Sequence, residues 1–518
     1  MAIPVPHSLG ADLIWWRTAN GMRTAACLYW GGDHAFDQAV HVVACLHDAD
    51  GREQVRWKVP LPSDLPLIFD SAAPGEWDRF PGVDGVLALH LCTDDPPGPE
   101  AFKHQRLFPI VDWRAPDGHL STLHSDQIIS RHVTGPQGFT EIVVLETDTE
   151  HNALVILNGD QTQAPGVLCI TVANHRGEKR TATHAPSMAP FTVVAVPLVS
   201  LFPGVAEFGE NLPLLVEGTF ASKGLFTRPY VVTTGSRQGA YHGGDLYDWT
   251  PVHPARHAII QGQVNPMAVM LDNQTRTWIN ILHSHGGHEQ DVPIDIRLFD
   301  DAGRCVLDVE QACAAARGKL TRIDLATLLP QGTEQFTGHV ALSYSLRLKQ
   351  YVPSHVQALV EYQHRESVAH IMGWSDEWNS RPALARRKKN PPHVNKSFYR
   401  VWHDGDFETE LVITNAGHRD YREAAHATLT LQGTGGAAAA VPVEIAPYAT
   451  LRATVSDLFG KDLAILGING IGALRIESTS DLAAISVTRN RRGTALAMEH
   501  FMSLLTRSEG KLRMPAGS

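Results

Sequence analysis

The feature of this sequence that most restricts its fold is an internal repeat that occurs four times. Each copy has a short apolar run, a polar turn, a second apolar run, a turn with glycine and, further on, a pair of bulky apolar residues. The turn glycines are Gly51, Gly177, Gly303 and Gly435, with steps of 126 (177 − 51), 126 (303 − 177) and 132 (435 − 303). The second markers are Phe69, Phe202, Leu329 and Phe459, with steps of 133 (202 − 69), 127 (329 − 202) and 130 (459 − 329). Two independent markers that keep nearly one period predict four copies of one structural module.

The apolar runs inside each copy are short and are separated by turns rich in Gly and Asn, which is typical of antiparallel strands. A module of this length with many short strands predicts an all-β fold of four tandem antiparallel β-sandwiches. We expect the modules to span residues 1–127, 128–250, 251–380 and 381–518, with a basic linker at the start of the last one. Within the strands, we expect Val155, Ile156, Leu411 and Ile413 to be divided between core and surface by alternation.

Several short motifs make the modules similar to the immunoglobulin-like modules found in tandem in many bacterial proteins. They are Asp50-Gly51, Leu157-Asn158-Gly159-Asp160 and Asp457-Leu458-Phe459. The resemblance covers most of the chain but concerns the fold only. Because such modules have no fixed chemistry, the resemblance implies no particular activity.

The last part of the chain has one pattern of a different kind. Met498, Phe501, Met502 and Leu505 recur at helical spacing. This spacing predicts a minor amphipathic helix near the C-terminus.

Composition restricts the compartment and the partners. The formal net charge is −11 and the pI is near 6.2, which argues against a nucleic-acid-binding surface over the whole protein. No apolar run is long enough to span a membrane, and the first residues lack the pattern of a signal peptide. The six cysteines form no C-x-x-C pair and are interpreted as buried free thiols. Together these features predict a cytoplasmic protein without a membrane span.

The sharpest local motif is His283-Ser-His285-Gly-Gly-His288. Three imidazoles within six residues are able to ligate a divalent metal such as zinc or iron. The motif superficially resembles the H-x-H-x-D-H metal motif of metallo-β-lactamase-type hydrolases, but Gly287 stands where that motif has Asp. Its place in the repeat equally fits an exposed loop between two strands without metal, so both interpretations stay open.

A second candidate site comes from the repeat itself, since each copy is expected to end with a histidine after its last strand. These residues are His124, His242, His370 and His500. Acidic and aromatic residues follow in the first three copies, among them Asp126, Asp245, Asp376, Trp249 and Trp374. If the modules pack around a common centre, these tails form one binding site from several modules. The alternative is that they are polar linkers between modules.

We therefore expect a non-catalytic binding or scaffold protein whose partner is a protein or a small molecule. The alternative is a metal-dependent enzyme with a His/Asp site at a module junction. The ligand, the substrate and the oligomeric state do not follow from the sequence.

Overall fold

The computed structural model describes most of the chain. The described residues are 5–29, 40–62, 65–80, 82, 84–96, 107, 109–124, 133–143, 152–225, 227–242, 264–282, 291–316, 318–345, 357–372, 395–416, 419, 422–478, 480, 482–500 and 502–503. The boundaries predicted at residues 127, 250 and 380 fall outside these ranges and stay predictions.

Strands dominate the described part of the chain, and they fall into four groups of eight. The first group is β1 (Ser8–Trp16), β2 (Arg23–Tyr29), β3 (Val40–His47), β4 (Glu53–Pro60), β5 (Pro66–Asp70), β6 (Gly85–Thr93), β7 (Ile110–Arg114) and β8 (Leu120–His124). The second is β9 (Val133–Val143), β10 (Asn152–Leu157), β11 (Leu168–Ala173), β12 (Lys179–Thr183), β13 (Val193–Pro197), β14 (Leu214–Gly224), β15 (Tyr230–Thr234) and β16 (Gln238–Tyr241).

The other two groups repeat this series. The third is β17 (Asn265–Leu271), β18 (Thr275–Leu282), β19 (Val292–Asp300), β20 (Cys305–Ala315), β21 (Leu320–Asp324), β22 (Phe336–Tyr344), β23 (Gln357–His364) and β24 (Ser367–Met372). The fourth is β25 (Asn395–Trp402), β26 (Phe407–Thr414), β27 (Ala425–Gln432), β28 (Ala438–Ile445), β29 (Thr450–Thr454), β30 (Ile471–Ser478), β31 (Ala483–Asn490) and β32 (Leu496–His500). A two-residue strand, β33 (Met502–Ser503), follows it.

Each group of eight strands forms one module of two packed sheets, and the strand order is the same in all four. The first, sixth, third and fourth strands form an outer sheet, as in β1-β6-β3-β4. The fifth, second, seventh and eighth form an inner sheet, as in β5-β2-β7-β8. Pairing within the modules is antiparallel. The prediction of an all-β chain of four tandem antiparallel sandwiches is therefore confirmed.

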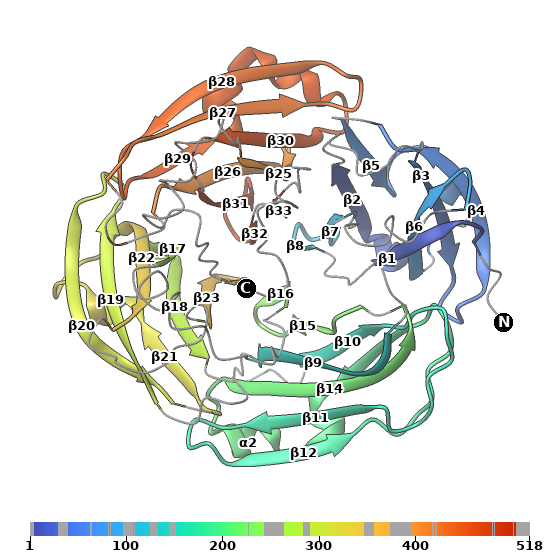
Figure 1. Ribbon diagram of the computed structural model, residues 1–518, viewed down its shortest axis with the longest axis horizontal. Coiled ribbons are helices and arrows are strands. Elements are labelled where there is room, and N and C mark those ends of the chain that lie inside the picture. The colour runs from blue at the N-terminus through green and yellow to red at the C-terminus, as the bar shows by residue number, and fades with distance from the viewer. Residues whose placement is uncertain are drawn as a thin grey trace.

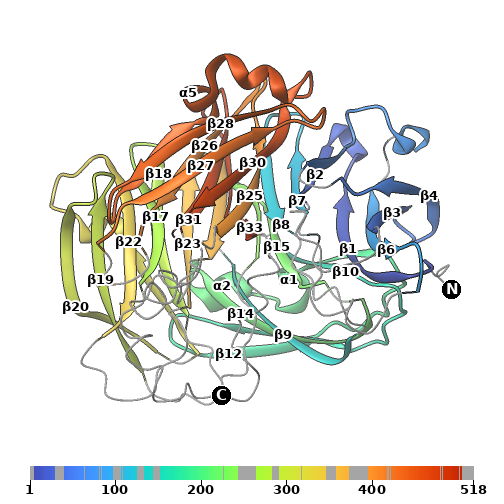
Figure 2. The same cartoon turned by 45° about the horizontal axis from the view of Figure 1, so that its top comes forward.

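The four modules form a closed ring, with the outer sheets on the rim and the eighth strands near the middle (Figure 1). The eighth strands neighbour one another in the cyclic order β8, β16, β24 and β32. One parallel contact, between Gln238 of β16 and Ser367 of β24, joins the inner sheets of modules 2 and 3. The ring closes where β30 of module 4 lies beside β2 and β5 of module 1 (Figure 2).

The middle strands of the inner sheets are largely buried on both faces, so the expected division between core and surface is wrong. Val155, Ile156, Leu411 and Ile413 are all fully buried. Side chains do alternate, but between two different cores. Ile156 packs inside module 2, whereas Val155 packs against module 1. Each ring junction thus replaces the solvent that would face one side of an isolated sandwich, which explains the near-continuous apolar runs in these strands.

Helical segments are few and short among the described residues. They are η1 (Ala19–Gly21), η2 (Glu76–Arg79), α1 (Leu198–Leu201), α2 (Val205–Gly209), η4 (Leu325–Leu328), α5 (Val455–Phe459) and η6 (Gly460–Leu466). None of those helices has the length and apolar character needed to cross a bilayer.

A short helix near the C-terminus is present as α5, which Thr454 caps by accepting from the N–H of Asp457. It is not formed by the residues from which we predicted it. Met498 lies in β32 and Met502 in β33, while Phe501 and Leu505 are outside the described residues. The helical spacing of these side chains was misleading because a strand buried on both faces is apolar at consecutive positions.

Candidate functional site

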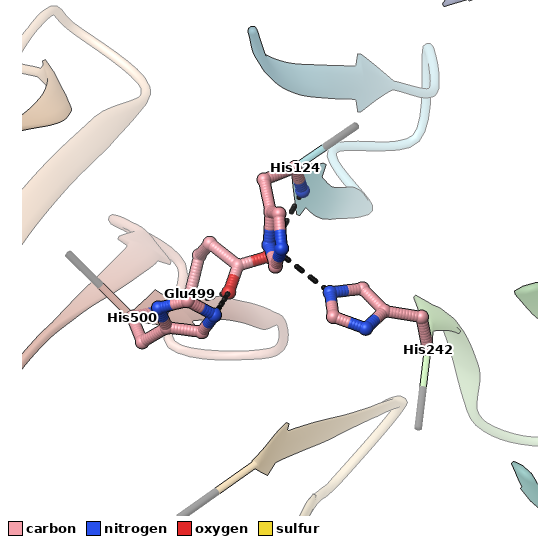
Figure 3. A group of neighbouring side chains, drawn as sticks. All are labelled: His124, His242, Glu499 and His500. Atoms are coloured by element: carbon pink, nitrogen blue, oxygen red, sulfur yellow. Dashed lines mark hydrogen bonds and ion pairs between the residues drawn. The ribbon is translucent and has the colours of Figure 1, made fainter. Parts of the chain in front are cut away.

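Each module has a histidine in its eighth strand or directly after it. His124 and His500 end β8 and β32, His242 follows the last residue of β16, and His370 is near the middle of β24. Because these four strands surround the axis of the ring, the backbones that carry the histidines lie at similar positions around that axis. The structure brings three of them together, and Figure 3 shows His124, His242 and His500 meeting with Glu499 of β32.

The four side chains form a compact cluster at the centre of the ring. One ligand atom from each lies within 4.8 Å of the corresponding atoms of the other three. His124 Nδ1 is 3.1 Å from Glu499 Oε2 and 3.0 Å from His242 Nε2. The His124 ring also lies edge to face with the His500 ring, with their centroids 4.6 Å apart. His124, His242 and Glu499 are buried, and His500 is partly buried.

The backbone fixes the orientation of Glu499. Its Oε2 accepts the N–H of His124 at 3.0 Å, and its Oε1 accepts the N–H of His500 at 2.8 Å. Burial raises the pKa of the Glu499 carboxyl, but the charge and hydrogen bond of His124, together with His500 and His242, lower it more strongly. The net pKa lies well below its usual range, so Glu499 is an ionised carboxylate in a buried place.

Arg228 contacts the cluster from the side of module 2. Its guanidinium donates to His242 Nδ1. A guanidinium cannot accept, so a neutral His242 ring carries its proton on Nε2 and points it at His124 Nδ1. His124 Nδ1 then has to accept, although it also faces the Glu499 carboxylate, another acceptor. If His124 Nδ1 instead carries a proton for Glu499, that proton faces the proton of His242. Either distribution of protons leaves one repulsive contact.

A cation at the meeting point of these atoms would remove the conflict at His124, because lone pairs of His124, His500 and Glu499 would then point at positive charge. His242 Nε2 would join them once its proton moves to Nδ1. Three imidazoles and one carboxylate are a common donor set for Zn²⁺ and other divalent transition metals. Ligand atoms around such an ion, with bonds of ~2.0–2.2 Å, lie roughly 3.4 Å apart. The 3.1 Å and 3.0 Å separations at His124 are close to that spacing. The residues therefore fit a divalent metal.

A small cavity adjoins the cluster between modules 1 and 2. His124 and His242 line one end of it, together with Thr227, Arg228 and Tyr230. Apolar side chains of β1, β7, β8 and β10 form the remaining wall. The cavity has room for about one water molecule. It is therefore too small for an organic ligand.

His370, the fourth equivalent histidine, does not join the cluster. Its Nε2 lies 3.6 Å from Glu361 Oε2, and both side chains are fully buried. Glu361 also accepts two hydrogen bonds from Arg322, at 2.6 Å and 3.0 Å. Burial raises the pKa of Glu361, but the contacts with His370 and Arg322 have the larger, opposite effect and lower the pKa to about 2. His370 is thus held by Glu361 of its own module and by the ring of Tyr241 in module 2, whose centroid lies 3.9 Å from that of His370.

The remaining residues predicted for the sites lie outside the described part of the chain. They are Asp126, Asp245, Asp376, Trp249 and Trp374 in the tails, and His283, His285 and His288 in the loop. Their roles stay predictions.

Sequence reasoning missed two members of the axial site, Glu499 and Arg228. Glu499 had one available signal. It directly precedes His500, whereas the equivalent neighbours of the other three histidines are Leu123, Tyr241 and Ala369. The prediction considered acids that follow each histidine and not those that precede it. Arg228 carries no sequence signal, since only the packing of module 2 onto module 1 brings it to the axis.

Comparisons with known proteins leave the chain without a family. No protein-family model matches it. No curated protein matches it either. One solved structure, described as a tetra-tandem repeat in the extending region of a large adhesion protein, aligns over 96% of this chain and 98% of that chain. The sequence identity is 11% and the TM-score is 0.10, which is too low to carry an argument about fold or function.

Proposed function

We propose that this protein is a metal-binding scaffold, in which a ring of four β-sandwiches holds one divalent transition-metal ion on its axis. The observation that carries the proposal is the convergence of His124, His242, Glu499 and His500, with ligand atoms within 4.8 Å of one another. These residues come from three different modules, so the ion would connect modules 1, 2 and 4.

Burial and preorganisation support this function over a purely structural hydrogen-bond cluster. The structure keeps an ionised carboxylate in the interior and orients it with two backbone N–H groups. In a structural cluster each proton donor would be expected to face an acceptor, whereas here His124 Nδ1 faces both the Glu499 carboxylate and His242 Nε2. The ring supplies what a metal scaffold needs, because strands packed on both faces hold the ligands with little freedom.

The compartment and the partner belong to the same proposal. We place the protein in the cytoplasm, which is supported by its six free cysteines. The exterior of the ring would serve as the surface for a protein or small-molecule partner. We also infer that the modules are distant variants of the immunoglobulin-like sandwich, in agreement with the two-sheet architecture.

Metal content after loading and dialysis tests the function. Purified protein is incubated separately with Zn²⁺, Co²⁺ and Mn²⁺, dialysed and analysed for metal. We expect about one ion per chain for the preferred metal, as for other closed sites of this donor type. Glu499→Gln should lower the affinity at least tenfold, because it removes the anionic ligand and keeps an acceptor for only one of the two backbone N–H groups.

The chain offers two matched controls. His124→Ala should lose the metal, whereas His370→Ala changes the equivalent residue of another module and should keep it. His283→Ala/His285→Ala should also keep it, since we assign the metal to the axis. Equal metal content in wild type, His124→Ala and Glu499→Gln would refute the axial site, and loss of metal only in the loop variant would move the site to residues 283–288.

A further inference from the structure

We propose that the axial metal binds together with a small monovalent anion, which occupies the cavity beside Arg228 and Tyr230. This inference rests on the proposed metal site and names its second ligand. The anion would bind beside the metal, on the side of His124 and His242, since both of these residues line the cavity.

Charge is the first argument for an anion. Among the described residues of the site, the carboxyl group of Glu499 is accompanied by the guanidinium of Arg228, which contacts His242 and is 4% exposed. A divalent ion would add two positive charges to this balanced pair. Excess charge in a buried site is strongly unfavourable, because the surrounding protein solvates it poorly. A monovalent anion removes half of the excess.

Hydrogen bonding is the second argument, and it is independent of the charge count. While Arg228 donates to His242 Nδ1, the neutral His242 ring keeps its proton on Nε2 and cannot use that atom to bind metal. An anion in the cavity gives the guanidinium another acceptor. His242 can then carry its proton on Nδ1 and present the Nε2 lone pair to the metal. Metal and anion would therefore bind cooperatively through Arg228.

The walls of the cavity indicate the class of anion. Tyr230 lines the cavity and is 3% exposed, and its Oη has no hydrogen-bond partner among the described residues. Buried hydroxyls rarely stay unpaired, so an acceptor bound beside Tyr230 would satisfy this O–H. The space for about one water molecule restricts that acceptor to one or two heavy atoms, such as a halide. Larger oxyanions, including sulfate, do not fit.

Cobalt binding in two matched salts tests the proposal. The metal-free protein is titrated with Co²⁺ in sodium chloride and in sodium methanesulfonate at equal ionic strength and pH, with calorimetry and visible absorption as readouts. We expect the Kd for Co²⁺ to be at least tenfold lower in chloride, and the d–d bands of the bound ion to change with chloride concentration. In Arg228→Met the chloride effect should disappear, and in Tyr230→Phe it should weaken. Arg180→Met removes an exposed arginine as a control and should behave as wild type.

The outcomes separate this inference from the proposed function. Co²⁺ binding with the same Kd and spectrum in both salts would overturn the anion site and leave the metal site intact. No Co²⁺ binding in either salt would refute the metal site itself. If Arg228→Met does not fold by circular dichroism, Arg228→Gln takes its place. A full chloride effect in the folded variant would overturn the assignment to this cavity.

Discussion

Replacing Arg400 with leucine should destabilise the whole ring, because this residue closes the junction between modules 4 and 1. Its guanidinium donates to Asp112 and to Thr122 Oγ1 in module 1, the latter at 3.1 Å. Arg400 is 0% exposed and Asp112 is 1% exposed. Burial raises the pKa of Asp112 to about 6, although Arg400 and Thr122 oppose this. Without Arg400, the carboxyl would remain buried without its counter-ion.

The size of the effect follows from the proton that Asp112 must then take up. Holding the carboxyl neutral at pH 7, against its ordinary pKa of 3.8, costs the variant about 4 kcal/mol at 1.36 kcal/mol per pH unit. The raised pKa of Asp112 already costs the wild type about 3 kcal/mol, so the proton adds about 1 kcal/mol to the penalty. Loss of the hydrogen bonds from Arg400 adds roughly 1.5–3 kcal/mol. The penalty should shrink by about 1 kcal/mol between pH 7 and pH 5. As the pH falls from 7 to 5, the free energy of unfolding of the variant rises over the whole range. That of the wild type rises only below about pH 6, where its Asp112 carboxyl takes up a proton.

Urea unfolding of wild type and Arg400→Leu at pH 7 and pH 5, followed by circular dichroism, measures this penalty. The matched control is Arg400→Leu/Asp112→Leu, which removes both charges and should recover most of the lost stability. An unchanged midpoint in the single variant would refute the buried junction. A double variant less stable than the single one would show that packing, and not the unpaired charge, controls the effect.

Two further predictions concern acid stability and the double burial of the inner sheets. Burial, with Arg297 nearby, lowers the pKa of His339 to about 3. The neutral His339 side chain should therefore contribute its full stability above pH 6.5, and this contribution should be lost as the pH falls from 6.5 towards 3. The loss should reach about 1 kcal/mol at pH 5.5. Unfolding midpoints measured across this pH range should therefore fall less steeply with pH in His339→Phe than in wild type. The same pH dependence in both proteins would contradict the prediction. Val155→Asp should cost more than about 3 kcal/mol, because the residue is 0% exposed between modules 1 and 2. Thr234→Asp, at an exposed position of β15, is its control and should shift the midpoint little, so equal effects of the two would show that Val155 faces solvent.

The site could be predicted in part because the repeat places one histidine in the same position of every module. Equivalent positions in modules around one axis are close in space, which is why the sequence alone was enough to group His124, His242 and His500. The same argument was too general for His370. It pairs with Glu361 on the neighbouring strand of its own sheet, and local strand pairing is not visible in the repeat.

The sequence by itself determined the repeat, the strand-rich modules and the histidine at the end of each, because these depend on local patterns of apolar residues and turns. Only the tertiary structure decided that the modules close into a ring and bury both faces of the middle strands of each inner sheet. It also decided that one carboxylate, Glu499, and one guanidinium, Arg228, meet the histidines on the axis. Two of these contacts join distant residues, since 118 positions separate His124 from His242 and 375 separate His124 from Glu499. They arise from the packing of one module on the next, which a local sequence pattern does not predict.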